Sequence, residues 1–206
     1  MIYPTASKSL TFDEFLQWKP ENGHYELHEG TIIEMQPTGK HEEIVEFLQS
    51  ELTLEARRQQ YPYRFPKNVL IKAPDRNSGY LPDVLVMERH AIQNEPLWKA
   101  SSTLTQGESI PLVIEVVSRN WRDDYLTKLR DYELLGIKEY WIVDYLGYGG
   151  ARYLGSPKQP TISVYVMAQG EYQVRQFRDQ ELIQSEIFPG LNLTAQQIFQ
   201  GESLLF

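Results

Sequence analysis

The stretch that decides the fold is PLVIEVVS, residues 111–118, which has the composition of a buried strand and yet carries an acid in its middle. Its Leu, Val and Ile side chains are the types that fill a sheet covered on both faces. Glu115 stands among them, and full burial without a partner raises the pKa of a carboxyl group by up to about 3–5 units. At about 1.36 kcal/mol per unit, that cost is large for a domain stable by roughly 5–15 kcal/mol. Glu115 therefore requires a compensating partner.

Composition favours one globular domain, because 206 residues with 41% hydrophobic content can build a core of their own. No apolar run reaches about 18 residues, so we expect no membrane span. Residues 1–15 lack the basic and apolar regions of a signal peptide. The absence of cysteine excludes disulfides, thiolate catalysis and Cys-based zinc sites. A cytoplasmic protein of bacterial type is the simplest interpretation.

The net charge of −8 argues against a general nucleic-acid coat, because phosphate binding depends on Lys and Arg. Basic residues nevertheless cluster between residues 57 and 76, where Asp75 is the one acid. One interpretation is a solvated edge of a helix and a strand, and the other is a local surface that faces phosphates. The candidates for phosphate contact are Arg57, Arg58, Arg64, Lys67 and Lys72.

Hydrophobic periodicity predicts a helix, three strands, a helix, a strand and then a β-rich tail. Helices are expected at 11–18, 37–60 and 121–135, a hairpin at 25–35, and strands at 63–73, 81–88, 111–118 and 138–145. Residues 89–109 form a loop or a short excursion. Further strands are expected at 161–167, 171–179 and 181–188, closed by residues 189–199. We therefore expect one α/β (α+β) domain over residues 1–206, with a mixed central sheet, a core of about 25–146 and an antiparallel β extension of about 151–206.

A second acid, Asp83, lies in the apolar stretch LPDVLVM, residues 81–87, and the proline before it places it near the start of a strand. Carboxylates on neighbouring apolar strands repel each other, and one stays protonated unless a cation lies between them. Oxygen ligands suit Mg²⁺ or Mn²⁺, with water completing the coordination shell. The alternative is that Asp83 and Glu115 each end a strand and accept hydrogen bonds from backbone amides.

Asp83 after a proline, followed by Glu115 about thirty residues later, resembles the PD-(D/E)xK phosphodiesterases, the fold of many restriction endonucleases. The chain resembles more closely the Uma family, a cyanobacterial-type family of restriction endonuclease-like proteins. The segments that carry this resemblance are YELHEG (25–30), His41 at the start of a helix, PDVLV (82–86), LVIEVVS (112–118), the spaced Asp124, Lys128 and Tyr132, GIKEYWIVD (136–144) and FPGLNL (188–193). It implies a restriction-endonuclease-like αβββαβ core and a metal held by Asp83, Glu115 and the Val116 carbonyl.

The chain departs from the superfamily pattern at the lysine expected two residues after the acid, where Val117 stands. On a helix with about 100° per residue, Lys128 lies at the rim of the apolar stripe of the 121–135 helix, and Asp124 lies on its other side. The resemblance implies that this helix supplies the displaced catalytic lysine, and Lys128 matches that position. The alternative is an exposed Lys128 paired with Asp124 four residues earlier.

His41 lies on the centre line of the buried stripe of the 37–60 helix, one turn before it. It is either a packed histidine or, as the resemblance implies, a catalytic candidate that binds phosphate or orients a carboxylate. Glu26 also matches a family position, but alternation does not determine which way it points. The other histidines show no ligand spacing, which argues against a zinc site. The supporting candidates are Glu26, Asp124 and Tyr132.

These residues predict a Mg²⁺- or Mn²⁺-dependent endonuclease that hydrolyses phosphodiester bonds in DNA. The metal would polarise the scissile phosphate and activate a water molecule, and Lys128 would orient that water or stabilise the developing charge. The alternative is a non-catalytic binding module or scaffold that retains the nuclease fold, which the acidic net charge and Val117 favour. A nuclease acting on RNA or single strands is a third interpretation. A homodimer would let one site per subunit cut both strands.

Overall fold

The computed structural model describes residues 9–20, 23–74 and 76–202, so Asp75 and the first eight residues lie outside the described part. Helices pack against two mixed sheets, one with the strand order β11-β10-β9-β8-β6-β3 and one with the order β2-β1-β5-β4-β7. The strands are β1 (Tyr25–His28), β2 (Thr31–Glu34), β3 (Tyr63–Arg64), β4 (Leu70–Lys72), β5 (Gly79–Tyr80), β6 (Val84–Glu88), β7 (Thr103–Leu104), β8 (Leu112–Val116), β9 (Glu139–Asp144), β10 (Thr161–Ala168) and β11 (Glu171–Phe177). In the described ranges, no helix is both long enough and apolar enough to cross a bilayer.

The described helices are mostly short, and three of them begin at a threonine cap. They are α1 (Phe12–Trp18), α2 (Gly39–Arg58), η1 (Ala91–Asn94), α3 (Trp98–Ser101), η2 (Gly107–Ser109), η3 (Asp123–Lys128), α4 (Leu129–Leu135), α5 (Ala151–Leu154) and α6 (Ala195–Gln200). The expected helix at 11–18 and the hairpin at 25–35 are confirmed as α1 and β1–β2. The hydroxyl of Thr11 accepts from the Glu14 amide at the start of α1, and that of Thr38 accepts from the His41 amide at the start of α2.

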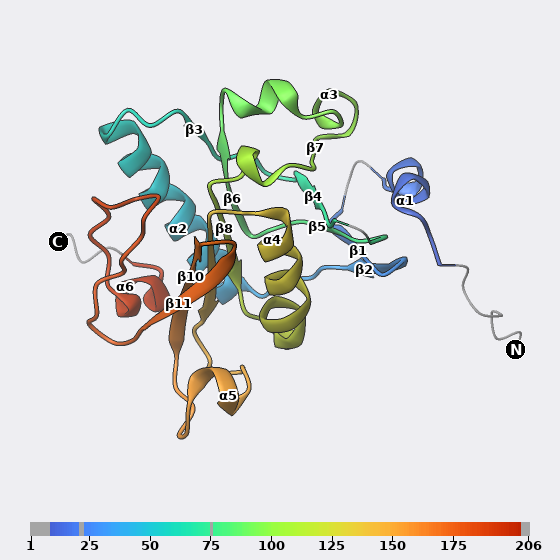
Figure 1. Ribbon diagram of the computed structural model, residues 1–206. Helices are drawn as coiled ribbons and strands as arrows, with labels where there is room; N and C mark the ends of the chain where they lie inside the picture. Colours follow the sequence, from blue (N-terminus) through green and yellow to red (C-terminus); the bar gives the residue numbers. More distant parts are fainter. Residues whose placement is uncertain (1–8, 21–22, 75, 203–206) are drawn as a thin grey trace, which may run out of the picture.

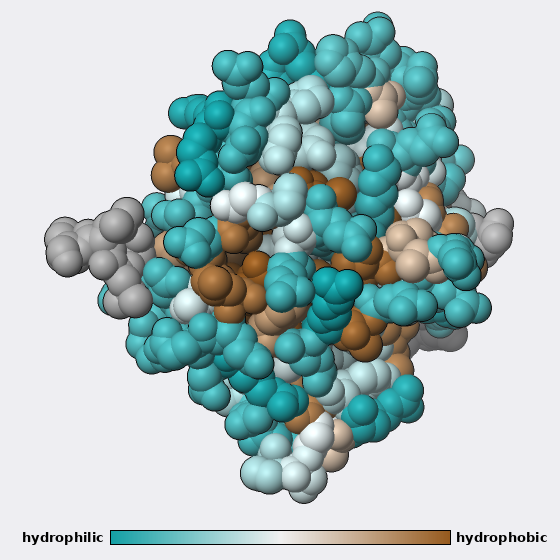
Figure 2. Space-filling model, turned by 60° about the vertical axis from the view of Figure 1, so that its left-hand side comes forward, coloured by the Kyte–Doolittle hydropathy of each residue, from teal (hydrophilic) through white to brown (hydrophobic). Residues whose placement is uncertain are grey.

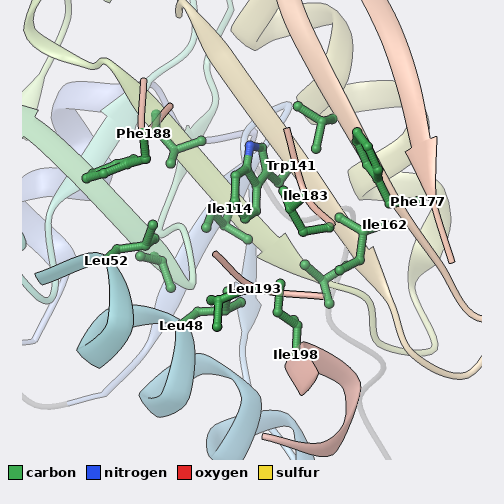
Figure 3. Close-up of a cluster of buried hydrophobic side chains, with 14 of the residues drawn as sticks. Leu48, Leu52, Ile114, Trp141, Ile162, Phe177, Ile183, Phe188, Leu193 and Ile198 are labelled. Carbon is green, nitrogen blue, oxygen red and sulfur yellow. The ribbon is translucent and has the colours of Figure 1, made fainter. Parts of the chain in front are cut away.

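The six-stranded sheet lies between α2 and α6 on one face and α4 on the other (Figure 1). On the first face the i, i+4 stripe of α2, including Leu48 and Leu52, packs with Trp141 and Ile114 of the sheet and with Ile198 of α6 (Figure 3). On the second face, the tyrosines of η3 and α4 pack against the alternate residues of the same strands. Every residue of β8 and β9 is buried as a result, and this is why their sequences are nearly continuous apolar runs.

The expected strand at 63–73 is wrong as a single element. Residues 63–64 form β3 on the six-stranded sheet, whereas residues 70–72 form β4 on the other sheet. Pro66 lies between them and cannot donate a hydrogen bond to a strand ladder, so the chain leaves one sheet there and joins the other. The excursion at 89–109 also has structure of its own, with η1, α3, β7 and η2.

The expected strand at 181–188 is also wrong, because only an isolated bridge joins Leu182 to Thr194. The backbone amides of Glu186 and Ile187 instead donate to the buried carboxylate of Glu139, at 2.7 and 3.3 Å. The same carboxylate accepts from Trp141 Nε1 at 2.7 Å and from Ser185 Oγ at 2.6 Å. The amides that a strand ladder would use are thus bound to an acid of β9, which attaches the C-terminal segment to the core.

Replacement of Glu139 by Ala removes the acceptor of four donors, of which Trp141 Nε1 and Ser185 Oγ are buried. We expect Glu139→Ala to lower the free energy of unfolding by about 2–4 kcal/mol, because each buried donor left without a partner costs roughly 1–3 kcal/mol and water can replace part of the loss. Urea unfolding followed by circular dichroism measures this change. Glu171→Ala, at an exposed position of β11, is the matched control and should change stability by less than about 0.5 kcal/mol. Equal stabilities of the two variants would contradict the anchoring role of Glu139.

Candidate active site

The antiparallel pairing of β6 and β8 brings the two acids together. Val84 pairs with Ile114 and Leu85 with Val113, so one further step in the same register sets Asp83 opposite Glu115. The Val116 amide donates to Asp83 Oδ2 at 2.7 Å. Asp83 therefore lies just before the start of β6, and its side chain is 21% exposed, whereas Glu115 is buried.

Lys128 is the cation at the centre of this cluster. Its Nζ lies 3.0 Å from Glu115 Oε2, 3.1 Å from Glu26 Oε1 and 3.7 Å from Asp124 Oδ1. The lysine side chain is only 3% exposed. The alternative of an exposed lysine paired with Asp124 is therefore wrong about the exposure, although the pairing itself is present. Lys128 is the partner that the buried Glu115 requires.

The helix that carries this lysine contains a π-turn. The expected helix over 121–135 is present, with a π-helical segment, η3, over Asp123–Lys128 and a regular α-helix, α4, from Leu129. A π-turn closes i→i+5 and so holds more residues per turn than the 3.6 of an α-helix. Single π-turns are frequent at functional sites. Lys128 still points inward, as the helical angles predict, and its side chain is buried rather than at the rim of the apolar stripe.

The remaining donors around the cluster come from three other elements. The Tyr132 hydroxyl of α4 donates to Glu115 Oε1 at 2.8 Å. The Leu81 amide donates to Glu26 Oε1 at 2.9 Å, and His28 Nε2 lies 2.7 Å from Glu26 Oε2. Both oxygens of each fully buried acid, Glu26 and Glu115, therefore have a partner.

Burial and the excess of acids perturb the pKa values of the cluster. Burial raises the pKa of Glu115 well above its usual value, and the charges of Asp83, Asp124 and Glu26 add to this effect while Lys128 opposes it. Burial likewise raises the pKa of Asp124 to about 7. Burial acts to raise the pKa of Glu26, but the charge of Lys128 and the hydrogen bond with His28 outweigh it, so the pKa is lowered. Burial lowers the pKa of Lys128, but its acidic neighbours dominate and raise it well above the usual value. One lysine does not neutralise all these acids, so a further cation at the cluster would favour the charged forms of Glu115 and Asp124.

His41 is buried in the first turn of α2, and its ring bridges that helix to β6. Its Nε2 lies 3.2 Å from Asp83 Oδ2, and its Nδ1 lies 3.3 Å from Glu42 Oε1. Burial acts to lower the pKa of His41, but the hydrogen bonds and charges of Asp83 and Glu42 raise it to about 9. The structure thus gives His41 a carboxylate-orienting contact, as one of the two alternatives for this residue requires.

The basic run of residues 57–76 does not gather at the acid cluster. Arg57 and Arg58 end α2, whose first turn carries His41, and 16 residues of helix span about 24 Å. Arg58 pairs with Glu55 at 2.5 Å, and Lys72 lies over the Phe12 ring at 5.0 Å. Lys67 is exposed in the connection between β3 and β4, and Arg57 and Arg64 line a separate groove. The five basic candidates therefore occupy different surroundings rather than one surface.

Comparison with known proteins agrees with this architecture. A family model described as "Putative restriction endonuclease", Uma2, matches residues 12–196. The chain belongs to the Uma2 family. The resemblance read from the sequence is thereby confirmed, and the membership supports a nuclease-like function for this chain.

A solved structure shows the same fold over nearly the whole length of both chains. It is titled "Crystal structure of a putative nuclease belonging to DUF820 from Anabaena variabilis ATCC 29413", with 21% identity, a TM-score of 0.70, and coverage of 93% of this chain and 98% of that chain. At this identity the likeness shows the fold alone, and it confirms the restriction-endonuclease-like architecture of this Uma2 member. No curated protein matches the chain.

Two residues of the site were missed by the sequence reasoning. His28 belongs to no metal-ligand spacing in the sequence, yet its Nε2 contacts Glu26. The available signal is that residues i and i+2 of a strand share a face. Tyr80 lies with its ring 5.8 Å from Lys128 Nζ and donates its hydroxyl to Asp131 at 2.7 Å. No sequence signal pointed to Tyr80, because β5 has only two residues.

Replacement of Lys128 by Met keeps the length of the side chain and removes its charge. We expect Lys128→Met to lower the free energy of unfolding by about 3–5 kcal/mol, the usual cost of leaving buried charges uncompensated. Adding Glu115→Gln to this variant should restore part of the loss, since it removes one of the repelling acids. Urea denaturation measures both changes, with Lys99→Met at an exposed site of α3 as the matched control. The neutralising role of Lys128 fails if Lys128→Met is as stable as the control.

Proposed function

We propose that this Uma2 member is a Mg²⁺- or Mn²⁺-dependent endonuclease that hydrolyses phosphodiester bonds in DNA, and that residues 1–206 form one endonuclease-like domain. The observation that carries the proposal is the acid cluster around Lys128, in which Asp83 and Glu115 lie opposite each other and Lys128 contacts Glu115 at 3.0 Å. Membership of a restriction endonuclease-like family supports the reaction class. The acid-rich cluster supports the dependence on a divalent cation.

The donor set fits a hard divalent cation. Asp83 Oδ1 makes no hydrogen bond with a described residue, and burial together with the neighbouring acids raises the pKa of Glu115, an effect that a further cation would oppose. Among the described residues no three His, Cys, Asp or Glu side chains are arranged as a metal site, so Asp83, Glu115 and the Val116 carbonyl would leave other ligand positions to water, as Mg²⁺ commonly requires. Such an ion, when bound, polarises a phosphate and lowers the pKa of a water ligand.

The residues of the chain divide the remaining tasks. Lys128 carries a fixed positive charge beside Glu115 and would stabilise the negative charge that develops on the phosphate oxygens. Glu26 holds the lysine from the opposite side, and Tyr132 fixes the rotamer of Glu115. His41 and the Val116 amide together hold Asp83 Oδ2, so that the exposed side of Asp83 faces the approaching substrate. A preorganised set of this kind loses little energy when the reaction begins.

The proposal includes two features of the assembly and its location. One cluster per chain cuts one strand, so cleavage of both strands requires a homodimer that presents two clusters to the duplex. A cytoplasmic location, where DNA is accessible, fits the proposed substrate.

Removal of Asp83 tests the activity. We expect Asp83→Ala to lower the rate of plasmid nicking in Mg²⁺ or Mn²⁺ by at least about 100-fold, because the variant loses both a ligand and the partner of His41. Agarose-gel conversion of supercoiled plasmid to the nicked form measures the rate, and EDTA should abolish it in the wild type. Asp13→Ala, an exposed acid in the first turn of α1, is the matched control and should retain full activity. Full activity of Asp83→Ala would remove Asp83 from the site.

Calorimetric titration tests the metal independently of cleavage. We expect Mn²⁺ to bind the wild type, and Asp83→Ala and Glu115→Gln to bind it at least about tenfold more weakly. The Asp13→Ala variant should bind as the wild type does. A wild type that binds no metal, even with short duplex DNA present, would favour a scaffold that retains the nuclease fold without the reaction.

A further inference from the structure

A groove of about 790 Å³ lies at the end of β6 that is remote from Asp83. It is bounded by the last turns of α2, by β3 and the residues around it, by the end of β6, and by η1 and α3. Both α2 and β3 lie on the side of the molecule that comes forward in Figure 2, where apolar side chains show between hydrophilic ones across the middle of the view. We call this concavity the aromatic groove. Its aromatic and basic lining residues are Arg57, Tyr61, Tyr63, Arg64, Phe65, Arg89 and Trp98.

The charge of the aromatic groove is opposite to that of the whole chain. Three arginines, Arg57, Arg64 and Arg89, line it, and no Asp or Glu appears among its described lining residues, although the chain has 28 acids and 20 bases. All three arginines are exposed, and none forms a salt bridge or side-chain hydrogen bond with another described residue. The nearby acid Glu88 on β6 accepts instead from the backbone amides of His90 and Ala91. The three guanidinium groups are thus available to an anionic ligand.

The floor of the aromatic groove is a preformed cluster of rings. Tyr61 and Tyr63 have centroids 5.4 Å apart, and both make edge contacts with the buried Phe188, at 6.0 and 5.6 Å. The centroid of the Phe65 ring lies 6.5 Å from that of Phe188. The two tyrosines are half-buried, so one side of each ring is supported by the core while the groove borders the other. Little conformational entropy is then lost when a flat ligand stacks there.

This combination suits nucleotides that are out of the base-paired stack. Exposed guanidinium groups bind phosphates, and aromatic faces stack on bases whatever their sequence. A base inside a duplex cannot enter a concave groove, whereas an unpaired base can. An acidic peptide would use the arginines but would leave the aromatic faces without a flat partner.

The position of the aromatic groove matches a polymer that also reaches the acid cluster. Asp83 precedes β6 and Arg89 follows it, so the six residue steps between them span about 20 Å. A strand that keeps the B-form rise of about 3.4 Å per nucleotide covers this distance with about six nucleotides. One strand can therefore contact both sites at once.

We infer that the aromatic groove binds unpaired nucleotides of a nucleic-acid strand about six nucleotides from the acid cluster, with Arg57, Arg64 and Arg89 on the phosphates and the aromatic floor under the bases. The choice of a nucleic acid as occupant rests on the proposed function. The contact itself does not require the metal or the reaction, so it can be measured without either.

The experiment is fluorescence anisotropy of a fluorescein-labelled oligothymidylate of about twelve nucleotides, titrated with the full chain in EDTA. Three phosphate contacts predict a slope of log K against log[salt] of about −2, and Arg57→Ala or Arg64→Ala should each reduce its magnitude by about 0.7. Tyr63→Leu should weaken binding at least about fivefold, whereas Tyr63→Phe, which keeps the ring, should bind as the wild type does. Arg175→Ala on β11, at the opposite edge of the same sheet, is the matched control and should leave both quantities unchanged.

The outcomes separate this inference from the proposed function. A wild type that cleaves plasmid while the groove variants bind as it does would overturn the inference and leave the function intact. A wild type that binds through the groove but cleaves no plasmid would overturn the proposed function and leave this inference intact. The inference is also overturned if Arg175→Ala changes binding as much as the groove variants do. Tighter binding of a duplex of equal length, or full displacement of the oligonucleotide by polyglutamate, would overturn it as well.

Discussion

The buried ion cluster around Lys128 is the interaction on which the rest of the site depends. Buried ion pairs seldom stabilise a protein more than apolar side chains of equal size would, because desolvation cancels most of their attraction. Here one lysine contacts Glu26, Glu115 and Asp124 within 3.7 Å, so negative charge is in excess. This excess of negative charge is the feature on which the proposed metal site rests. The cost is limited by donors such as the Tyr132 hydroxyl, which complete the partners of each acid.

The two mixed sheets and the helices serve mainly to bring these groups to one point. The central strand β8 supplies Glu115, and its neighbour β6 is preceded by Asp83. The first turn of α2 supplies His41 from one face of the sheet, and the π-turn η3 supplies Lys128 from the other. The hairpin of the second sheet adds Glu26. Residues from five separate segments therefore meet, and loss of any single segment would leave charges without partners.

Much of this arrangement could be predicted from the chain, because an acid in an apolar strand is a costly feature that requires a reason. Alternation and the proline before Asp83 located both acids correctly on neighbouring strands, and the family resemblance located Lys128. The helical angles also allow Lys128 to reach inward, as it does in the structure, but they do not predict the π-turn in that helix. The strand expected at 181–188 failed for a similar reason: its amides bind Glu139, a residue more than forty positions earlier.

The sequence by itself determined most of the elements, the family and the acids, since hydrophobic period, capping residues and spaced motifs are local properties of a chain. Tertiary structure alone decided which groups share charge. The contact of Glu26 with Lys128, the ring of Tyr80 beside Lys128, and the convergence of arginines and aromatic rings at the far end of β6 all join segments remote in sequence. Distances between such groups depend on how the two sheets and the helices pack, and electrostatic energies vary steeply with those distances and with burial.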